Sequence, residues 1–241
     1  MELYFFTAVD DNPVYRAEAE ILIASGRKFG REIHLYDVPP TTCWNRYKVD
    51  LIASELPPAD RYIYLDSDTV LTGPGDWEAD DCQGVTDPLY FIDHDPLRCR
   101  HTNGFMRNHT VCIGEGPGYE FLAALWHEWH EPIWPNSGVV VLDAAIRRPF
   151  ATVWKRWMAI VDAPCNAGFM VGDEAACMFA RQGFALPLLP PRFNYLCKWQ
   201  PPLADWRSVH LIHADGNVTG PKRQPYNAAV AALHLEKEPT P

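Results

Sequence analysis

The sequence predicts an α/β fold in a single domain, with a mostly parallel central sheet flanked by helices. Apolar strand-like runs alternate with helical patterns through the first part of the chain, and this order is typical of a parallel sheet. The third apolar run, over residues 62–65, ends in two closely spaced acidic residues. In an open α/β sheet, ligands bind just beyond the carboxyl ends of the strands. The predicted fold therefore also predicts where a functional site should lie.

The first part of the chain contains three expected strands joined by two expected helices. Asp10, Asn12 and Pro13 break the first strand, and Gly26 is the expected end of the first helix. Apolar residues recur at helical spacing within each expected helix. We expect strands over residues 3–9, 31–36 and 62–65, and helices over residues 14–25 and 43–54.

The second part of the chain begins with a loop-rich stretch, residues 72–116, in which we expect long loops and short strands. Asp173 is the expected N-cap of a later helix. A tail over residues 227–241 is Ala-rich and then acidic, so we expect it to be partly frayed and the domain to span residues 1–226. The other expected elements are helices over 117–131, 150–161 and 173–181 and strands over 138–142 and 209–213.

Composition indicates a soluble globular protein, with 47% apolar and 22% charged residues. The formal net charge of −10 argues against nucleic acid as a partner, because phosphate binding favours a basic face. No stretch reaches the ~18 uncharged apolar residues of a membrane span, and the N-terminus lacks the basic start of a secretory signal. Seven cysteines with no pair at zinc-ligand spacing indicate reduced thiols. We expect a cytoplasmic protein with no stable membrane anchor.

Asp66 and Asp68 form the most informative motif of the chain. They stand two residues apart where a buried strand should end, and two carboxylates in that place suit a hard divalent cation. Asp and Ser are also common in turns after strands, for local hydrogen-bonding reasons. His213, at the end of the last expected strand, would add an imidazole ligand, although a histidine there is often a core residue. The mixed ligand set favours Mn²⁺ over Ca²⁺, with Mg²⁺ as a second choice.

Five segments, in order along the chain, resemble the metal-dependent GT-A glycosyltransferases, the family that includes glycogenin and the bacterial lipooligosaccharide galactosyltransferases. The resemblance covers about residues 1–226 and implies a Rossmann-like GT-A domain. The matching segments are Thr-Ala-Val-Asp-Asp-Asn over residues 7–12, Leu-Asp-Ser-Asp-Thr-Val over 65–70, Pro-Asn-Ser-Gly-Val-Val-Val-Leu-Asp over 135–143, Gly-Asp-Glu over 172–174 with Arg-Phe-Asn-Tyr over 192–195, and the stretch from Leu211 to Lys222.

The resemblance implies an enzyme that moves a hexose from a UDP-sugar to an acceptor hydroxyl, with Mn²⁺ and with retention of configuration. The implied metal ligands are Asp66, Asp68 and His213, and the acceptor is expected to be a soluble saccharide or a protein side chain. The residues implied to bind the nucleotide are Thr7, Ala8, Asp10, Asn12, Arg46, Lys48, Ser67, Gly216 and Lys222.

The roles of several of these residues have competing structural explanations. A carboxylate at Asp10 and an amide at Asn12 could recognise a uracil edge, but the same residues could form a turn that caps the next helix. Arg46, Lys48 and Lys222 could contact a diphosphate, whereas a single lysine is usually a solvated surface residue.

The implied catalytic residues are Asn136, Asp173 and Glu174, and here the chain departs from the family. The family has Gln where this chain has Glu174, which could attack the anomeric carbon, stabilise oxocarbenium-like charge, or serve only as an acid at a helix N-terminus. Lys222 also lies nine residues after His213, against six in the family. The closing loop therefore carries an insertion.

Two other functions fit parts of the sequence. A haloacid-dehalogenase-type phosphohydrolase would use Asp66 as nucleophile and Asp68 as acid/base, because Asp-Ser-Asp-Thr-Val fits its motif. That motif normally closes the first strand, whereas here about sixty residues precede it. A GT-A domain that binds a nucleotide sugar without transferring it is the other alternative, and Glu174 in place of Gln leaves it open.

Overall fold

The fold was analysed in a computed structural model. The expected helix over 117–131 and most of the loop-rich stretch over 72–116 lie outside the residues that the structure describes. Those residues are 1–40, 42, 44–79, 84–86, 136–161, 172–184, 186–197, 203–214 and 219–235.

The strands of the described residues form a large central sheet with the order β2-β1-β3-β6-β5-β7. β1 pairs in parallel with both β2 and β3, and β5 with β7, while β6 runs antiparallel to β3 and β5. The mostly parallel sheet predicted from the sequence is therefore confirmed. The strands are β1 (Leu3–Val9), β2 (Ile33–Asp37), β3 (Arg61–Leu65), β5 (Gly84–Thr86), β6 (Asn136–Asp143) and β7 (Leu188–Leu189).

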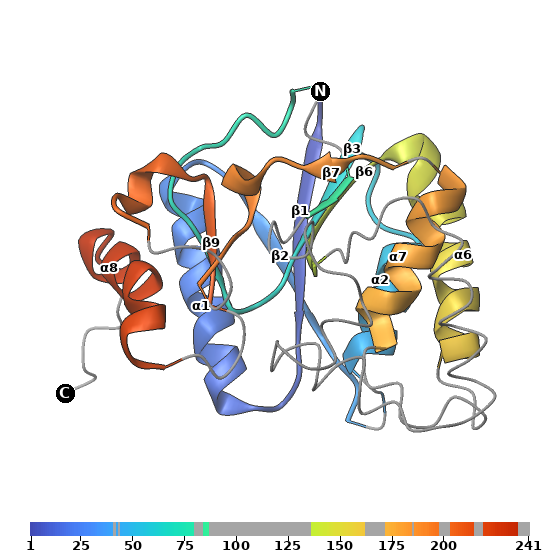
Figure 1. The fold of residues 1–241 in the computed structure, drawn as a ribbon, viewed down its shortest axis with the longest axis horizontal. Coiled ribbons are helices and arrows are strands. Elements are labelled where there is room, and N and C mark those ends of the chain that lie inside the picture. The colour runs from blue at the N-terminus through green and yellow to red at the C-terminus, as the bar shows by residue number, and fades with distance from the viewer. Residues whose placement is uncertain are drawn as a thin grey trace, which may run out of the picture.

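Helices cover both faces of this sheet, with α1 on one side and α2, α6 and α7 on the other (Figure 1). α8 lies beyond α1, at the outer side of the molecule. Apart from the stretch outside the described residues, the expected helices are present. Their ends differ by up to three residues, except that α6 begins six residues before the expected start at residue 150. The helices are α1 (Pro13–Lys28), α2 (Trp44–Ala53), α6 (Ala144–Val161), α7 (Gly172–Phe184) and α8 (Gln224–Ala232).

Gly26 does not end the first helix, contrary to the sequence prediction. α1 continues to Lys28. A Cβ on Gly26 would lie 2.6 Å from Cδ1 of Ile33, so the glycine allows close packing of α1 on β2. The backbone reversal falls at Gly30, whose φ of 71° lies in the left-handed region that glycine tolerates.

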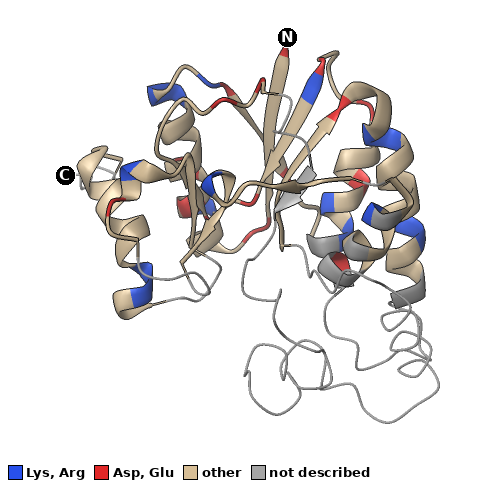
Figure 2. Ribbon diagram, turned by 45° about the horizontal axis from the view of Figure 1, so that its top comes forward, with Lys and Arg blue, Asp and Glu red and all other residues tan. Residues whose placement is uncertain are grey.

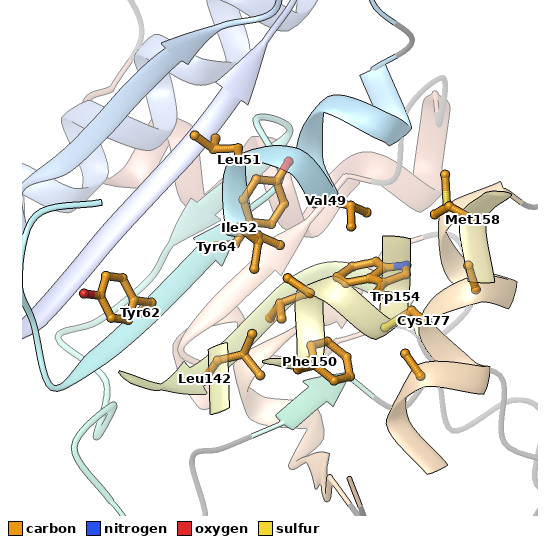
Figure 3. Close-up of a cluster of buried hydrophobic side chains, with 14 of the residues drawn as sticks. Val49, Leu51, Ile52, Tyr62, Tyr64, Leu142, Phe150, Trp154, Met158 and Cys177 are labelled. Carbon is orange, nitrogen blue, oxygen red and sulfur yellow. The ribbon is translucent and has the colours of Figure 1, made fainter. Parts of the chain in front are cut away.

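The face covered by α2, α6 and α7 contains the largest cluster of buried apolar side chains. Figure 3 shows Tyr64 and Leu142 of the sheet meeting Val49 of α2 and Phe150 and Trp154 of α6. All of these side chains are buried, and aromatic rings in such a core contribute a large apolar area. This packing fixes α2 and α7 relative to the ends of β3 and β6.

A second, three-stranded sheet lies beside α1, and the sequence analysis did not predict it. Its strands have the order β4-β9-β8, in which Thr69 of β4 stands opposite His213 of β9. The chain leaves the large sheet after Leu65 and enters the small sheet at Thr69, so the acidic motif forms the junction between them. The strands are β4 (Thr69–Leu71), β8 (Tyr195–Leu196) and β9 (Leu211–His213).

The predicted C-terminal tail begins inside a packed helix. Residues Gln224–Ala232 form α8, and Tyr226, Ala229 and Val230 are buried against the small sheet. The expected boundary after residue 226 is therefore wrong, because the alanines of this stretch allow close packing. The described residues also form the 3-10 helices η3 (Pro191–Phe193), η4 (Trp206–Ser208) and η5 (Gly220–Arg223).

Among the described residues, no helix combines the length and the apolar composition that crossing a bilayer requires.

Candidate metal centre

The acidic motif is held between the two sheets by backbone and side-chain hydrogen bonds. The Asp66 N–H donates to the Gly138 carbonyl at 2.7 Å, which ties the turn to β6 of the large sheet. The Ala214 N–H donates to the Asp68 carbonyl at 2.9 Å, which ties it to the end of β9 in the small sheet. The Thr69 hydroxyl donates back to the Asp66 carbonyl at 2.7 Å. These bonds fix both acidic side chains at the carboxyl end of β3.

Asp66, Asp68 and His213 converge in the position that the sequence analysis assigned to a metal site. One possible ligand atom from each residue lies within 4.8 Å of the others. Nε2 of His213 is 3.1 Å from Oδ1 of Asp68 and 4.0 Å from Oδ2 of Asp66. Two carboxylates and one imidazole form a donor set that suits Mn²⁺ and related divalent cations. The residues present therefore fit such an ion.

Gly138 leaves the space that the His213 ring occupies. A Cβ at this position would lie 2.3 Å from Cε1 of His213 and 2.8 Å from Oδ1 of Asn136, well inside normal contact distance. The expected Asn-Ser-Gly strand is β6. It contributes to the site because Gly138 has no side chain and so leaves room for the imidazole ring. His213 itself is 3% exposed. Its ring is held on one side by β6 and on the other by the small sheet.

Asp66 belongs to a buried network around the ammonium group of Lys48. Nζ of Lys48 lies 2.9 Å from Oδ2 of Asp173, 3.1 Å from Oδ1 of Asp66 and 3.1 Å from Oγ of Ser137. The Ser137 hydroxyl donates to Oδ2 of Asp173 at 2.6 Å, and the Tyr64 hydroxyl donates to Oδ1 of Asp66 at 2.9 Å. Three hydrogen-bonding directions of an ammonium group match these three partners.

Burial and charge act in opposite directions on the ionisation of this network. Burial lowers the pKa of Lys48, but the carboxylates of Asp173 and Asp66 outweigh it, so the pKa is raised. Burial raises the pKa of Asp66, although the positive charges of Lys48 and His213 oppose the shift. Burial and the charge of Asp66 raise the pKa of Tyr64 well above its ordinary value. At neutral pH the network therefore contains a charged lysine and a neutral phenol donor.

A cavity of about 330 Å³ opens beside these groups. It borders all three candidate metal ligands and the Lys48 network. Tyr15 and Ser137 line it although the sequence analysis did not select them. The lining residues are Asp10, Tyr15, Lys48, Asp66, Ser67, Asp68, Asn136, Ser137, Asp173 and His213.

Residues 10–12, the end of the predicted nucleotide segment, connect β1 to α1 and cap the N-terminus of this helix. Oδ1 of Asn12 accepts from the Val14 N–H at 3.0 Å, and Oδ1 of Asp10 accepts from the Asn12 N–H at 2.9 Å. Asn12 is thus the N-cap of α1, as the structural explanation of this motif predicts. Thr7 and Ala8 are fully buried within β1. Asp10 is the residue of this group that borders the cavity.

The basic residues selected from the sequence occupy different environments. Lys48 is 1% exposed and points into the site, where it pairs with two carboxylates. Arg46 is exposed on α2, and Lys222 is exposed in η5. Gly216 and the side chain of Glu174 lie outside what the structure describes. Arg46 and Lys222 are thus exposed, and Lys48 is the buried residue among the three.

Three residues of the site had little or no signal in the sequence. Tyr15 stands in the first turn of α1, where its aromatic side chain could equally have been core. Ser137 and Asn194 lie inside the Asn-Ser-Gly and Phe-Asn-Tyr segments that the family resemblance pointed to, but no pattern distinguished them. Asn194 is fully buried, and its Oδ1 lies 3.2 Å from Nδ1 of His213.

Comparisons with known proteins bear on the fold. No protein-family model matches the chain, and a search of curated proteins finds no match. Among solved structures, the chain is similar to a glycosyltransferase involved in the glycosylation of the major capsid of PBCV-1. The match has 11% sequence identity and a TM-score of 0.53, and it covers 96% of this chain and 100% of that one. The chain therefore shares its Rossmann-like α/β fold with a glycosyltransferase over nearly its whole length.

Proposed function

We propose that the protein is a metal-dependent glycosyltransferase that moves a hexose from a UDP-sugar to the hydroxyl of a saccharide or protein acceptor. The observation that carries this proposal is the convergence of Asp66, Asp68 and His213 beside a cavity at the carboxyl end of β3. Ligands of open α/β sheets bind at such strand ends. The shared fold with a known glycosyltransferase supports the class of reaction.

The charge of the cavity supports a requirement for a cation. Four aspartates, residues 10, 66, 68 and 173, line it together with the ammonium group of Lys48 among the described residues. A diphosphate would be repelled by this wall unless a cation neutralised part of it. Mn²⁺ held by Asp66, Asp68 and His213 would stabilise the negative charge that the departing diphosphate acquires. We therefore expect the cation and the nucleotide to bind together.

The residues of the large-sheet side are suited to hold a sugar in place. Lys48 and Ser137 fix one oxygen of Asp173 through contacts of 2.9 and 2.6 Å. The Trp154 indole N–H donates to the Asp173 carbonyl at 2.8 Å, so the start of α7 is anchored in the core. A carboxylate oriented in this way suits hydrogen bonds from sugar hydroxyls. Asn136, on the neighbouring strand, adds an amide to the same wall.

The α1 side of the cavity is suited to a nucleobase. The Asp10 carboxylate can accept a hydrogen bond from the N3–H of uracil, and the Tyr15 ring offers an aromatic face. Burial and the charge of Asp68 raise the pKa of Tyr15, so its hydroxyl stays protonated at neutral pH. We assign the uridine to this end and the hexose to the Asp173 end.

Isothermal titration with UDP tests the metal site. Wild-type protein should bind UDP with Mn²⁺ and fail to bind it in EDTA. Asp68→Asn should lose this binding, whereas Asp205→Asn, which changes an exposed acid on η4, should keep it. Wild-type UDP affinity in Asp68→Asn, unaffected by EDTA, would show that the metal site is misassigned.

Donor and product analysis tests the reaction. Thermal shift with UDP-glucose, UDP-galactose, UDP-N-acetylglucosamine and GDP-sugars should identify the donor, since bound donor raises stability by about 2.7 kcal/mol at a hundredfold excess over Kd. Slow hydrolysis of that donor separates an enzyme from a nucleotide-sugar-binding module. A phosphohydrolase should instead cleave phosphate monoesters and ignore UDP.

Stereochemistry tests the roles of Glu174 and of retention. We propose that an α-linked donor gives an α-linked product. If the Glu174 carboxylate acts in the chemistry, Glu174→Gln should keep UDP affinity and lower turnover. Unchanged turnover would reduce Glu174 to a helix-start residue, and an inverted product by NMR would discard the retaining mechanism.

A further inference from the structure

We infer that Asn194 is a positioning residue that fixes the tautomer and ring orientation of His213, so that its Nε2 faces the metal site. The inference rests on the proposed role of His213 as a metal ligand. It is carried by a chain of hydrogen bonds that begins at the backbone of β6 and ends at the imidazole ring. Each bond in the chain determines the direction of the next.

The chain begins at the backbone N–H of Gly138. This group donates to a side-chain atom of Asn136 at 2.9 Å. A backbone N–H can only donate, so the atom that it meets must be the carbonyl oxygen of the Asn136 amide. The Gly138 N–H thereby settles which way the Asn136 amide faces, a choice that side-chain shape alone leaves open.

The second bond orients Asn194. Its amide nitrogen lies 3.0 Å from the same oxygen of Asn136. Because that oxygen can only accept, Asn194 must present its NH₂ group there and turn its own carbonyl oxygen away. This oxygen lies 3.2 Å from Nδ1 of His213. A carbonyl oxygen can only accept, so Nδ1 of His213 carries the proton.

The consequence falls on the other ring nitrogen. With the proton on Nδ1, a neutral imidazole has its lone pair on Nε2, and this atom faces Oδ1 of Asp68 at 3.1 Å. Two acceptor atoms at that separation repel each other unless a second proton or a metal cation lies between them, and either one binds Nε2. Histidine ligands in metal sites commonly donate their second N–H to a carbonyl or carboxylate in this way. The Asn194 amide gives His213 that partner.

The surroundings keep the relay rigid. Asn194 is 0% exposed, so bulk water cannot substitute for it. It follows η3, and its N–H donates to the Pro191 carbonyl at 3.2 Å. The preceding residue, Phe193, is fully buried against Trp77, with ring centroids 5.0 Å apart. The amide of Asn194 is therefore delivered from a packed segment and not from a free loop.

Nitrogen-15 NMR of the histidine rings tests the relay directly in the wild-type protein. His213→Gln identifies the His213 signals. We expect a protonated, hydrogen-bonded Nδ1 in the metal-free protein, and coordination through Nε2 once a diamagnetic divalent ion such as Zn²⁺ is added. An unprotonated Nδ1, or coordination through Nδ1, would overturn the inference. This measurement needs no substitution at Asn194, so it stands even if variants there fold poorly.

Mn²⁺ binding to variants measures what the relay contributes. Asn194→Leu removes both hydrogen bonds and should lower Mn²⁺ affinity about 10–100-fold, followed by the EPR signal of free Mn²⁺. Asn194→Asp keeps an acceptor for Nδ1–H and should retain more affinity. Ile33→Ala, a buried change in the edge strand β2, should lower stability and leave Mn²⁺ affinity unchanged. Equal affinity in Asn194→Leu and wild type would contradict the inference.

The two proposals fail in different ways. If the wild-type protein binds no Mn²⁺, the proposed metal-dependent function fails. The NMR measurement on the metal-free protein still decides the relay, since the proton on Nδ1 depends on Asn194 and not on an ion.

Discussion

Asp66 and Asp68 stand two residues apart and point toward the same site, yet their surroundings differ. Asp66 directly follows β3 of the large sheet, and its carboxylate meets the ammonium group of Lys48 and the hydroxyl of Tyr64. Asp68 directly precedes β4 of the small sheet, and its carboxylate meets the imidazole of His213. Figure 2 shows that acidic and basic residues are interspersed over the described ribbons.

The comparison separates stability from ligand binding. A buried carboxylate beside a buried lysine is part of the folded core, because either charge alone would be costly to bury. A carboxylate that faces an imidazole keeps its oxygens directed at a cation site. We therefore expect changes around Asp66 to affect folding as well as the site, and changes around Asp68 to affect metal binding more than folding.

Replacing Lys48 should have the largest effect on stability. Lys48→Met leaves Asp66 and Asp173 buried beside each other without their shared cation. Loss of one partner from a buried ion pair costs about 3–5 kcal/mol. Urea unfolding followed by circular dichroism should show this loss in the free energy of unfolding.

A surface lysine gives the matched control. Lys155 pairs with Asp50, and its side chain is 63% exposed. Lys155→Met should therefore cost about 0–1 kcal/mol. Similar losses in Lys48→Met and Lys155→Met would show that the buried ion pair of Asp66 contributes no more to stability than a surface ion pair does.

Gly138 links the two sides, and Gly138→Ala should disturb the Asp68 side. The new Cβ would lie 2.3 Å from Cε1 of His213, so the ring must move away from Asp68. We expect a loss of about 1–3 kcal/mol from overpacking and a larger proportional loss in Mn²⁺ affinity. Calorimetric titration with Mn²⁺ and urea unfolding measure the two effects.

Gly183 offers the same substitution in open space. The surroundings of a Cβ at this helical position are empty to 4 Å. Gly183→Ala should therefore raise stability by about 0.4–1 kcal/mol and leave metal affinity unchanged. A Gly138→Ala protein that binds Mn²⁺ like wild type would contradict the proposed position of the His213 ring.

The β2-β1-β3 part of the large sheet was predictable because its information is local. Each strand and helix of residues 1–65 has its own hydrophobic pattern, and the order of elements implies the parallel pairing. A strand was also expected within β6, but not its antiparallel direction, and neither β5 nor β7 was specified.

Of the small sheet, the sequence predicted only the strand that contains β9, over residues 209–213. β4 has three residues and β8 has two, and strands of that length carry too little periodicity to be recognised. The pairing of the three strands joins residues far apart in the chain, so the sheet itself was not predicted.

The candidate site divides in the same way. Asp66 and Asp68 were found because two acids after an apolar run form a local signal. His213 was noted as a possible ligand because it ends an expected strand, whereas a catalytic role for Asp173 came only from the family resemblance. Lys48 was selected for a diphosphate contact, but its position between two carboxylates depends on how α2 and α7 pack across the end of β3. No pattern near Lys48 contains that information.

Tyr64→Phe should weaken the Asp66 side by a smaller amount. The variant loses the hydrogen bond to Oδ1 of Asp66, while Lys48 still compensates the charge. A hydrogen bond to a charged group contributes about 1.5 kcal/mol or somewhat more. Tyr36→Phe is the matched control, because its hydroxyl meets the neutral hydroxyl of Tyr4 at 2.7 Å. Urea unfolding should show a smaller loss for Tyr36→Phe, and the reverse order would argue against a charged Asp66.

The smallest effect on the free energy of unfolding should come from a change at Glu18 of α1. This effect should depend on pH. Burial raises the pKa of Glu18 more than its hydrogen bond from Arg223 lowers it. Its Oε2 is buried without a hydrogen-bond partner within the described residues. A raised pKa means that the folded state favours the protonated form. The stability due to this shift is present below the unfolded pKa of about 4.3 and is lost as pH rises through the folded pKa.

Glu18→Gln removes that titration. The free energy of unfolding of wild type minus that of the variant should therefore be greatest near pH 4 and should decrease toward pH 7. In Arg223→Met, which keeps Glu18, the free energy of unfolding should fall more steeply from pH 4 to pH 7 than in wild type. The reason is that the ionised Glu18 carboxylate then loses its ion-pair partner. Urea unfolding at several pH values measures all three proteins. A difference that grows with pH would mean that the Arg223 ion pair, and not burial, dominates at Glu18.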